Sequence, residues 1–261
     1  MGRTIIVGDV HGCRRELELL LEDLAFGTGD RLVFVGDLVA RGPDSLGVLD
    51  VVRRTGALVV RGNHEHKLLQ WRSARLARLR GEEARTVRLG PIHAELARKL
   101  RPVDWSLLET SPFYLDLPEH GLRVVHAGVV PGVPIERTKL ATLTRIRTVK
   151  SDGRPSVRDG AVLWGARYTG PPHVVFGHNA APGLQLHRWA TGLDTGCVYG
   201  GQLTALVLRD GQRVPMTFAA RRACLAARQA ARVYFEPGNG HRAQVVELRA
   251  QHAGRRRAVG A

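Results

Sequence analysis

The stretch Val33-Phe34-Val35-Gly36-Asp37-Leu38-Val39-Ala40-Arg41-Gly42 decides how the rest of the chain is interpreted. An apolar run of this kind is typical of a parallel strand that is buried on both faces. Open α/β sheets carry their chemistry just beyond the carboxyl ends of such strands, which is where Asp37 and Arg41 follow. The stretch therefore predicts a carboxylate presented at one edge of a parallel sheet.

The same plan, an apolar strand followed by a polar loop and a helix, recurs in the N-terminal part of the chain. The predicted strands span residues 4–8, 31–35 and 57–60. Helical periods follow, and Asp44 and Gly56 are suited to cap the two ends of the second helix. Successive units of this kind predict a largely parallel sheet.

The next segment, about residues 68–112, keeps a helical period that Pro102 interrupts. We expect it to be a helical cap inserted into the α/β domain. It is rich in arginine, at positions 72, 75, 78, 80, 85, 88, 98 and 101. A solvated face is the commoner role of such residues, and we favour it over a cap that covers an anionic site.

Strands are predicted again further along the chain, at residues 113–117, 122–125, 144–149 and 174–176. Residues 193–196 and 203–208 are expected to be closing strands of a second sheet. We assign one α/β domain to residues 1–210 and a C-terminal extension, packed on the same domain, to residues 211–261. Within that extension we expect a helix over 219–231, a hairpin of 233–235 with 244–248, and a disordered basic tail.

Composition sets limits on the class of protein. With 261 residues the chain can bury a core without disulfides or structural metals. The cysteines Cys13, Cys197 and Cys224 form no C-x-x-C pair, so we expect free thiols in a reducing cytoplasm. No apolar run approaches the ~20 residues of a membrane span, and we expect neither a membrane nor an obligate protein partner.

The formal net charge of +15 ordinarily points to nucleic acid or another polyanion as partner. However, nearly all of the 39 basic residues are arginine, which a GC-rich coding sequence would produce without selection for binding. We therefore give the clustered arginines more weight than the total charge.

Polar residues in loops that contain a glycine follow five of the predicted strands. They are Asp9, His11, Asp37, Asn63, His64, His126 and His178. A single Gly-Asp is often only a turn, and a lone histidine is usually structural. Five such strand ends in series are not a chance occurrence. Converging carboxylate, imidazole and amide groups predict a site for two transition-metal ions, with Asp37 as a natural bridge.

Two metal ions that share a water lower its pKa from ~15.7 towards ~7 and stabilise the oxygens of a phosphoryl group under attack. The sequence therefore predicts hydrolysis of a phosphate ester or anhydride. Arg41, at the edge of the cluster, is suited to bind two phosphate oxygens. His64 is placed to protonate the leaving oxygen.

Five blocks of the sequence, as they stand here, resemble the phosphoprotein-phosphatase-type metallophosphoesterases: GDVHG (8–12), GDLVARG (36–42), GNHE (62–65), HAG (126–128) and GH (177–178). The resemblance covers about residues 4–208 and implies a four-layer αββα sandwich, the calcineurin-like fold. It implies Asp9, His11 and Asp37 as ligands of one metal ion, and Asp37, Asn63, His126 and His178 as ligands of the other. It also implies His64 as the general acid and Arg41 as a phosphate ligand.

Within this family the sequence looks most similar to the bacterial symmetrical diadenosine tetraphosphatases, the ApaH-like phosphatases. They share GDLVARGP (36–43), a segment like 143–147 and an ending like 193–204. The resemblance makes Arg145 and Arg147 candidates to bind the polyphosphate beyond the reacting phosphorus, although alternating arginines also suit an exposed strand. Two departures stand out. Ala40 replaces the Asp that orients the catalytic histidine in protein Ser/Thr phosphatases, and Asn179 stands where the bacterial hydrolases usually have Trp.

We therefore expect a cytoplasmic two-metal hydrolase that cleaves diadenosine tetraphosphate symmetrically to two ADP by attack of a metal-bound hydroxide. Mixed His, Asn and Asp ligands favour Mn²⁺, with Co²⁺, Zn²⁺ or Fe as alternatives. A Ser/Thr or broad-specificity protein phosphatase of the same family is the first alternative function. A polyanion- or RNA-binding protein with a degenerate metal site is the second. A small-molecule nucleotide is the expected partner, and capped RNA and phosphoproteins remain open as substrates.

Overall fold

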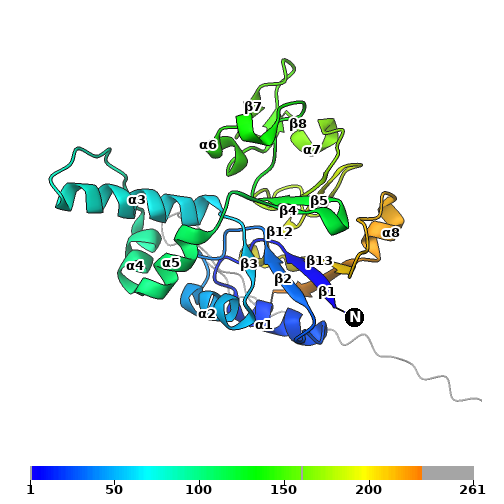
Figure 1. Cartoon of the computed structure of the whole chain (residues 1–261), viewed down its shortest axis with the longest axis horizontal. Helices are drawn as coiled ribbons and strands as arrows, with labels where there is room; N and C mark the ends of the chain where they lie inside the picture. The colour runs from blue at the N-terminus through cyan, green and yellow to red at the C-terminus, as the bar shows by residue number, and fades with distance from the viewer. Residues whose placement is uncertain (1, 160, 231–261) are drawn as a thin grey trace, which may run out of the picture.

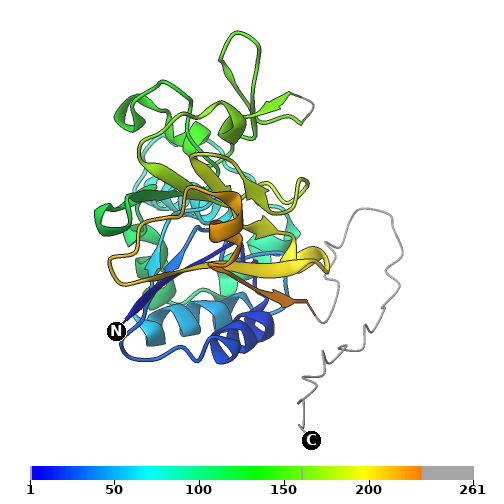
Figure 2. The same cartoon turned by 90° about the vertical axis from the view of Figure 1, so that its right-hand side faces the viewer.

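The computed structural model of the chain describes residues 2–159 and 161–230. Two β-sheets lie face to face, with helices on their outer sides, so the molecule is a four-layer α/β sandwich (Figures 1 and 2). The fold class predicted from the sequence is confirmed. In the described residues no helix combines the length and the apolar character needed to cross a membrane.

The first sheet has the strand order β12-β13-β1-β2-β3, with β14 paired to β13. Its strands are β1 (Arg3–Val7), β2 (Arg31–Phe34), β3 (Leu58–Val59), β12 (Asp194–Thr195), β13 (Gln202–Arg209) and β14 (Leu225–Gln229). β1, β2 and β3 are parallel, as the repeated strand-loop-helix plan predicts, whereas β13 runs antiparallel to β1.

The assignment of the closing strands to a second sheet was wrong, because β12 and β13 belong to the first sheet. The reason lies in the alternation along β13. Leu203 and Ala205 face the outer helices, while Leu206 and Leu208 face the opposite sheet. A strand that is apolar on both faces must be covered on both, and the position beside β1 offers that cover.

The second sheet has the order β10-β11-β9-β5-β4. Its strands are β4 (Tyr114–Leu117), β5 (Leu122–Val125), β9 (His173–Phe176), β10 (Gln185–Leu186) and β11 (Ala190–Gly192). β5, β9 and β11 are parallel to one another. Both sheets therefore present carboxyl ends of parallel strands, and the loops that follow these ends can meet between the sheets.

Helices α1 (Arg14–Asp23) and α2 (Ser45–Thr55) cover the outer face of the first sheet (Figure 1). Helix α2 begins and ends as predicted. The Asp44 carboxylate accepts a hydrogen bond from the Gly47 N–H at 2.7 Å, and Gly56 closes the helix in the left-handed conformation at φ 61°.

The core has three apolar layers that follow from the alternation of side chains along the strands. Ile5 and Val7 of β1 face α1 and α2, while Ile6 between them points to the second sheet. On the far face of that sheet, Phe176 packs against Trp164 of a short helix. The sheets are thus buried on both sides.

The segment after β3 is helical, with α3 (Asn63–Leu79), α4 (Pro91–Lys99) and α5 (Pro102–Thr110). These helices lie to one side of the two sheets (Figure 1). Asp104, at the third position of α5, accepts the Arg101 N–H at 2.9 Å and so caps the start of this helix.

Beyond the second sheet lies a small sheet that was not predicted. It consists of β6 (Thr148–Val149), β7 (Pro155–Ser156) and β8 (Val162–Leu163), flanked by α6 (Leu140–Leu143) and α7 (Trp164–Arg167). The strand predicted over residues 144–149 is correct only at its end, because residues 144–146 continue from α6 into a turn. The remaining short helices, of the 3₁₀ type, span Pro118–His120, Ile135–Arg137 and Cys197–Tyr199.

The C-terminal part of the described chain adds α8 (Phe218–Arg222) and β14 to the sandwich. The helix predicted over residues 219–231 was largely wrong: it ends at Arg222, and β14 then pairs with β13. The alanine-rich composition favours a helix locally, but the free edge of β13 offers a ladder of hydrogen bonds and outweighs that preference. The predicted hairpin of 233–235 with 244–248 and the basic tail lie outside the described residues.

Candidate metal centre

The loops after β1, β2, β3, β5 and β9 meet between the two sheets and bring the predicted polar residues together. Hydrogen bonds tie the sheets at this point: the His178 N–H donates to the Asp9 carboxylate at 3.1 Å, and His126 Nδ1 bonds the Val35 carbonyl at 3.0 Å. A side chain at Gly177 would collide with Asp9 Oδ1, which explains the glycine beside His178.

Several of these residues have a backbone conformation that side chains disfavour. His11, Asp37 and His178 have φ values of 48°, 49° and 70°, in the left-handed region. Such strain persists only where the surroundings enforce it and is concentrated at functional sites. The conformation aims the three side chains at one another.

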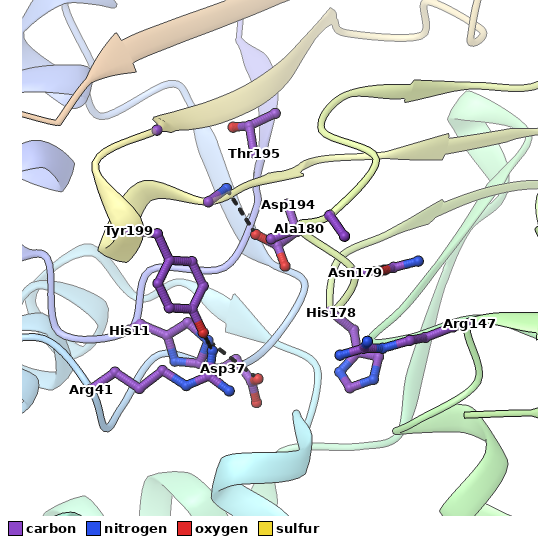
Figure 3. Close-up of a pocket in the computed structure, with 13 residues that line it drawn as sticks. His11, Asp37, Arg41, Arg147, His178, Asn179, Ala180, Asp194, Thr195 and Tyr199 are labelled. Atoms are coloured by element: carbon purple, nitrogen blue, oxygen red, sulfur yellow. Dashed lines mark hydrogen bonds and ion pairs between the residues drawn. The ribbon is translucent and has the colours of Figure 1, made fainter. Parts of the chain in front are cut away.

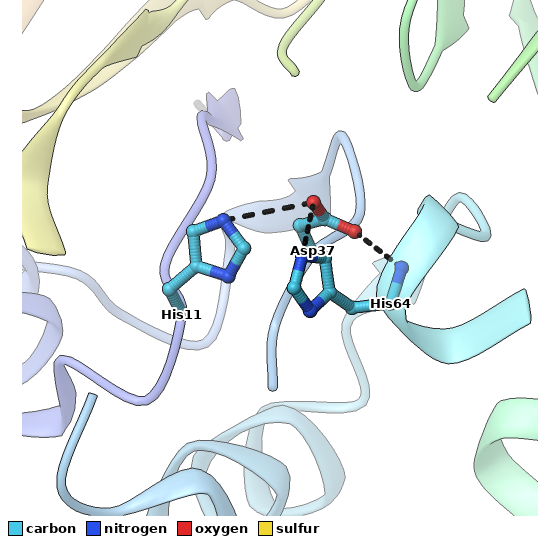
Figure 4. Close-up of side chains that lie close together, drawn as sticks. All are labelled: His11, Asp37 and His64. Carbon is cyan, nitrogen blue, oxygen red and sulfur yellow. Dashed lines mark hydrogen bonds and ion pairs between the residues drawn. The ribbon is translucent and has the colours of Figure 1, made fainter. Parts of the chain in front are cut away.

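Asp37 lies at the centre of the cluster, and histidines surround its carboxylate (Figure 4). Its Oδ2 atom is 3.4 Å from His126 Nε2, 3.6 Å from His11 Nε2 and 3.9 Å from His64 Nε2. The ligand atoms of His11, Asp37 and His64 lie within 4.8 Å of one another, as do those of Asp37, His126 and His178. Two groups of potential ligands therefore share Asp37.

The tautomers of two histidines follow from their backbone contacts. His11 Nδ1 lies 3.1 Å from the Val39 carbonyl and His126 Nδ1 lies 3.0 Å from the Val35 carbonyl, so each Nδ1–H donates. The neutral ring then has its lone pair on Nε2, which faces the Asp37 carboxylate. Two acceptors that face each other in this way fit a cation between them.

Asn63 adds another acceptor that faces acceptors, in the group formed by Asp37, His126 and His178. Its amide oxygen lies 3.0 Å from His126 Nε2, 2.8 Å from His178 Nδ1 and 3.3 Å from Asp37 Oδ2. All of these are acceptors when both histidines are neutral. Turned over, the amide nitrogen donates to all three atoms, whereas an oxygen in this position suits a cation among the four atoms. The donor set suits a metal ion.

The pKa values of Asp37 and the surrounding histidines indicate that the cluster favours additional positive charge. Burial disfavours both charges of the Asp37–His126 pair, yet the attraction between them wins: it raises the pKa of His126 to about 10 and holds the pKa of Asp37 well below its usual range. Burial lowers the pKa of His11 to about 4 and that of His178 to about 3, so both rings are neutral and able to bind a metal.

Asp194 completes this side of the site, although the sequence argument assigned it no role. It is buried, accepts the Gly196 N–H at 3.1 Å, and with burial it raises the pKa of Asp9 well above its usual range. Its signal was present in the sequence, because Asp194 is one more carboxylate that follows an apolar residue, with a glycine two positions further on.

Glu65 organises the loop that carries Asp37. The buried carboxylate accepts N–H groups of Gly62 and Asp37 at 2.9 Å through Oε2, and that of Leu38 at 2.9 Å through Oε1. It thereby fastens the end of β2 to the start of α3. Sequence reasoning noted its motif but not this role.

The surroundings of His64 show the consequence of Ala40. The position where a protein phosphatase carries the orienting carboxylate has only a methyl group here, and His64 Nδ1 is buried with no hydrogen-bond partner among the described residues. Instead, His93 of α4 stacks on the His64 ring at 4.8 Å and 22°, and His11 meets it edge-on at 4.8 Å. Packing between rings orients His64. Nothing in the sequence signals His93, because it comes from a separate helix.

Arg41 lies at the mouth of the site beside Tyr199 (Figure 3). Its guanidinium donates a hydrogen bond to the Tyr199 hydroxyl and lies 5.4 Å from the centre of that ring. Both residues line a cavity of about 480 Å³ whose wall also includes Asp37, His178 and Asn179. Tyr199, 49% exposed, was not singled out from the sequence.

Arg145 and Arg147 point to different places. Arg147 lines the cavity at Asp37 and forms an ion pair with Asp159 at 3.0 Å. The backbone of Arg145 forms a hydrogen bond with the His178 ring, but its side chain lines another cavity, along α3. The structure thus brings together Asp9, His11, Asp37, Asn63, His64, His126 and His178, with Arg41 and Arg147 at the rim and Arg145 outside.

This fold, with two ligand groups that share one carboxylate at the strand ends, defines a metal-dependent phosphoesterase. The chain belongs to the calcineurin-like phosphoesterase family, whose pattern matches residues 2–211. The phosphoesterase family and its diadenosine-tetraphosphatase relatives, expected from the sequence, are confirmed.

Similar proteins include two named bis(5'-nucleosyl)-tetraphosphatase PrpE, asymmetrical. The protein from Oceanobacillus iheyensis is 33% identical over 219 residues, which cover 77% of this chain and 86% of that protein. The protein from Halalkalibacterium halodurans is 34% identical and covers 77% and 88%. Both carry the name asymmetrical, whereas the sequence argument expected symmetrical cleavage.

Among solved structures, the one described as "Crystal structure of a putative diadenosine tetraphosphatase" has a TM-score of 0.72 and 36% identity, and covers 88% of this chain and 94% of that one. A protein serine/threonine phosphatase from Saccharomyces cerevisiae has a TM-score of 0.52 at 15% identity, over 91% and 81% of the two chains. The second likeness shows the fold alone.

Proposed function

We propose that this protein hydrolyses dinucleoside tetraphosphates asymmetrically, so that diadenosine tetraphosphate yields AMP and ATP. The observation that carries the proposal is the sharing of Asp37 between two ligand groups, seen together with relatives that are named for this reaction. The symmetrical products expected from the sequence, two ADP, become the alternative outcome of the test.

We assign the metal ligands as in the sequence argument: Asp9, His11 and Asp37 on one side, and Asp37, Asn63, His126 and His178 on the other. When bound, two divalent ions would supply Lewis acidity at the phosphoryl group and an acidified water. Mn²⁺ is the proposed metal, since imidazole, amide and carboxylate ligands in one site suit a transition ion.

Two side chains of the protein would bind the phosphate and donate the proton. Arg41, held at the rim by Tyr199, would bind two oxygens of the reacting phosphate. The His64 imidazole, held between His11 and His93, would donate a proton to the leaving oxygen. Burial keeps the pKa of His64 well below its usual range, and the negative charge of a bound tetraphosphate favours the protonated ring.

The cavity beside Asp37 supports attack on the phosphorus next to one of the nucleosides. It has a volume of about 480 Å³, opens next to the cluster and carries the exposed Tyr199 ring. A nucleoside fits there, with one phosphate between it and Asp37. That arrangement places the phosphorus next to the nucleoside at the centre, and its hydrolysis releases a mononucleotide.

The experiment is hydrolysis of diadenosine tetraphosphate, a phosphopeptide and p-nitrophenyl phosphate, with and without Mn²⁺, followed by chromatography of the products. AMP plus ATP in equal amounts supports the proposal, and only ADP supports symmetrical cleavage instead. Faster turnover of the phosphopeptide would point to a protein phosphatase. No metal-dependent turnover of any substrate would favour a polyanion-binding protein.

Observations of the site weigh against both alternatives. A protein phosphatase of this family relies on the carboxylate that Ala40 lacks, and His64 Nδ1 is left without it. A degenerate metal site would have lost ligands, whereas all the predicted ligand residues converge here.

We also propose that residues 211–230, the described part of the C-terminal extension, belong to the same structural unit as residues 1–210, since β14 extends the first sheet. The cytoplasm is the proposed compartment. Cys13, Cys197 and Cys224 are all free thiols, as a reducing environment would leave them.

A further inference from the structure

A second cavity, of about 890 Å³, runs along α3 on the side of the loop 81–90. Arginine side chains surround it, and we call it the arginine groove: Arg61, Arg85, Arg88 and Arg145. They come from the end of β3, from the loop between α3 and α4, and from the turn after α6. The groove thus collects cations from segments that are far apart in the sequence.

The floor of the groove is one stripe of α3. His66, Gln70, Ser73 and Ala77 lie on it at helical spacing. These four side chains are polar or small and leave room for hydrogen bonds, while Leu69 beside them adds an apolar surface. From His66 to Ala77 it extends about 17 Å, at about 1.5 Å per residue, which suits an extended chain of phosphates with a nucleoside.

Arg61 is held by the protein, because its guanidinium donates to the Ser111 carbonyl at 3.0 Å and to the Glu109 carbonyl at 2.8 Å, and it faces the carboxylates of Glu65 and Glu109. The charge of the other three groove arginines is not balanced in this way. In the described part of the chain, no carboxylate forms an ion pair with Arg85, Arg88 or Arg145, and Glu83 is the acidic residue in the lining. Burial, and then Arg61 and Arg145, lower the pKa of His66, which reports the positive field.

Other arginines of the same helical segment are neutralised. Arg72 pairs with Glu109, Arg80 with Glu82 at 2.6 Å, and Arg101 with Asp104 at 2.8 Å. The paired arginines are the solvated face expected from the sequence. In the described residues, Arg85, Arg88 and Arg145 of the groove have no such ion pair, and their mutual repulsion favours a bound polyanion.

The groove shares a wall with the metal centre. Arg61 precedes Gly62 and Asn63 directly, and His66 follows in the first turn of α3. On the opposite side, the backbone of Arg145 holds the His178 ring while its side chain enters the groove. Arg147, two residues on, lines the cavity at Asp37. The two arginines therefore diverge on either side of His178.

We propose that the arginine groove binds the distal polyphosphate and nucleoside of the substrate, the part that leaves as a nucleoside triphosphate. This inference rests on the proposed function and deepens it. One nucleoside occupies the cavity at Tyr199, the adjacent phosphorus lies at Asp37, and the remaining phosphates continue into the groove. The asymmetry of the products then follows from two unlike subsites on either side of the centre.

The test compares Arg85→Ala/Arg88→Ala with a matched control, Arg15→Ala/Arg98→Ala. The control removes two exposed arginines of α1 and α4, outside the groove lining. The groove variant is expected to raise the KM for diadenosine tetraphosphate about tenfold or more, as lost charged hydrogen bonds do, with kcat unchanged. Its kinetics with p-nitrophenyl phosphate, which does not reach the groove, and those of the control should match wild type.

A binding measurement separates this inference from the proposed function. Inorganic tripolyphosphate is titrated calorimetrically onto the chain in the presence of a chelator, so that no hydrolysis is involved. Wild type and the control should bind it alike, and the groove variant about tenfold more weakly, with a dependence on salt that is smaller than in wild type. This result would support the groove even if diadenosine tetraphosphate were not hydrolysed.

Equal tripolyphosphate affinity in the groove variant and the control would overturn the proposal. So would a rise in KM for p-nitrophenyl phosphate as large as that for the tetraphosphate, because the loss would then lie in the centre itself. A rise confined to a phosphopeptide or to RNA would assign the groove to a macromolecular partner and overturn it as well.

Discussion

Two regions of this molecule bury charged side chains, and they do so in opposite ways. Around Asp37, carboxylate, imidazole and amide groups face one another with few donors between them. Around Arg221, a single cation is enclosed completely by acceptors that the chain itself provides.

Arg221 of α8 is fully buried. Its Nε donates to the Pro215 carbonyl at 2.9 Å, and its Nη1 donates to the His187 carbonyl at 2.6 Å. Further contacts reach the carbonyls of Ala190, Arg188 and Met216 and the hydroxyl of Thr191. Several of these acceptors surround the turn before β11, so the residue fastens the C-terminal segment to the second sheet.

The difference shows which buried polar groups point to a ligand. Arg221 is satisfied within the chain and needs no partner, so it is a structural clamp. At Asp37 the acceptors outnumber the donors, and the attraction of the Asp37 carboxylate, against burial, raises the pKa of His126 to about 10, so the cluster favours a cation. A cluster of facing acceptors is therefore better evidence of a binding site than burial or charge alone.

The largest expected effect concerns Asp37→Asn. The change removes the charge shared by both ligand groups, so activity should fall by on the order of a thousandfold or more, as loss of metal assistance costs several kcal/mol. Initial rates with diadenosine tetraphosphate measure it. The control is Asp116→Asn, an exposed acid paired with Arg123, which should keep full activity. Full activity in Asp37→Asn would show that the cluster around Asp37, like that around Arg221, is only structural.

Arg221→Met tests the other region. It should lower the free energy of unfolding by about 3–5 kcal/mol, because the enclosing carbonyls lose their donor in a buried place. Urea denaturation followed by circular dichroism measures the loss. Arg222→Met, at the exposed neighbouring position, is the control and should unfold like wild type. If both variants lose the same stability, the clamp assignment is wrong.

His93→Ala tests how much of the centre serves chemistry rather than structure. Loss of the stacked ring should lower kcat roughly ten- to hundredfold, since a misplaced catalytic group is costly, while His93→Phe should restore most of it. In a His64→Asn background the His93→Ala change should have little further effect. An undiminished effect in that background would show that His93 does not act through His64.

The smallest effect is a pH dependence next to the Arg221 clamp. His173, buried and bonded to Thr191, has its pKa lowered to about 3, mainly by burial. In the unfolded chain His173 binds a proton near pH 6.5, whereas in the folded chain it stays neutral down to about pH 3. The free energy of unfolding is therefore not reduced by this group above pH 6.5, and it falls progressively as the pH is lowered towards 3. His173→Gln should recover about 2 kcal/mol of the loss in the free energy of unfolding at pH 5. Urea denaturation at pH 5 and at a pH above 6.5 measures it. An unchanged pH dependence would contradict the assignment.

The sequence predicted best those features that local chemistry dictates. Asp37, His126 and their partners stand within two residues of a glycine, because their loops need close backbone approach and unusual conformations, and that leaves a visible pattern. The cap at Asp44 and the stop at Gly56 are of the same kind. Each of these signals lies within a few consecutive residues.

The features that sequence reasoning missed depend on packing between distant segments. His93 meets His64 only because α4 folds against the start of α3, and Arg221 finds its acceptors in another sheet. The two apolar faces of β13 are visible in the sequence and explain its place in the first sheet. They do not identify the strand with which β13 pairs. The arginines of the helical segment divide into paired and unpaired ones only in three dimensions.

The central claim is that the cluster around Asp37 is built for two metal ions. Calorimetric titration of the metal-free chain with Mn²⁺, with metal content confirmed by elemental analysis, tests it most directly. We predict two equivalents bound per chain in wild type and loss of both in Asp37→Asn. One equivalent or none in wild type, or two retained by Asp37→Asn, would contradict the account.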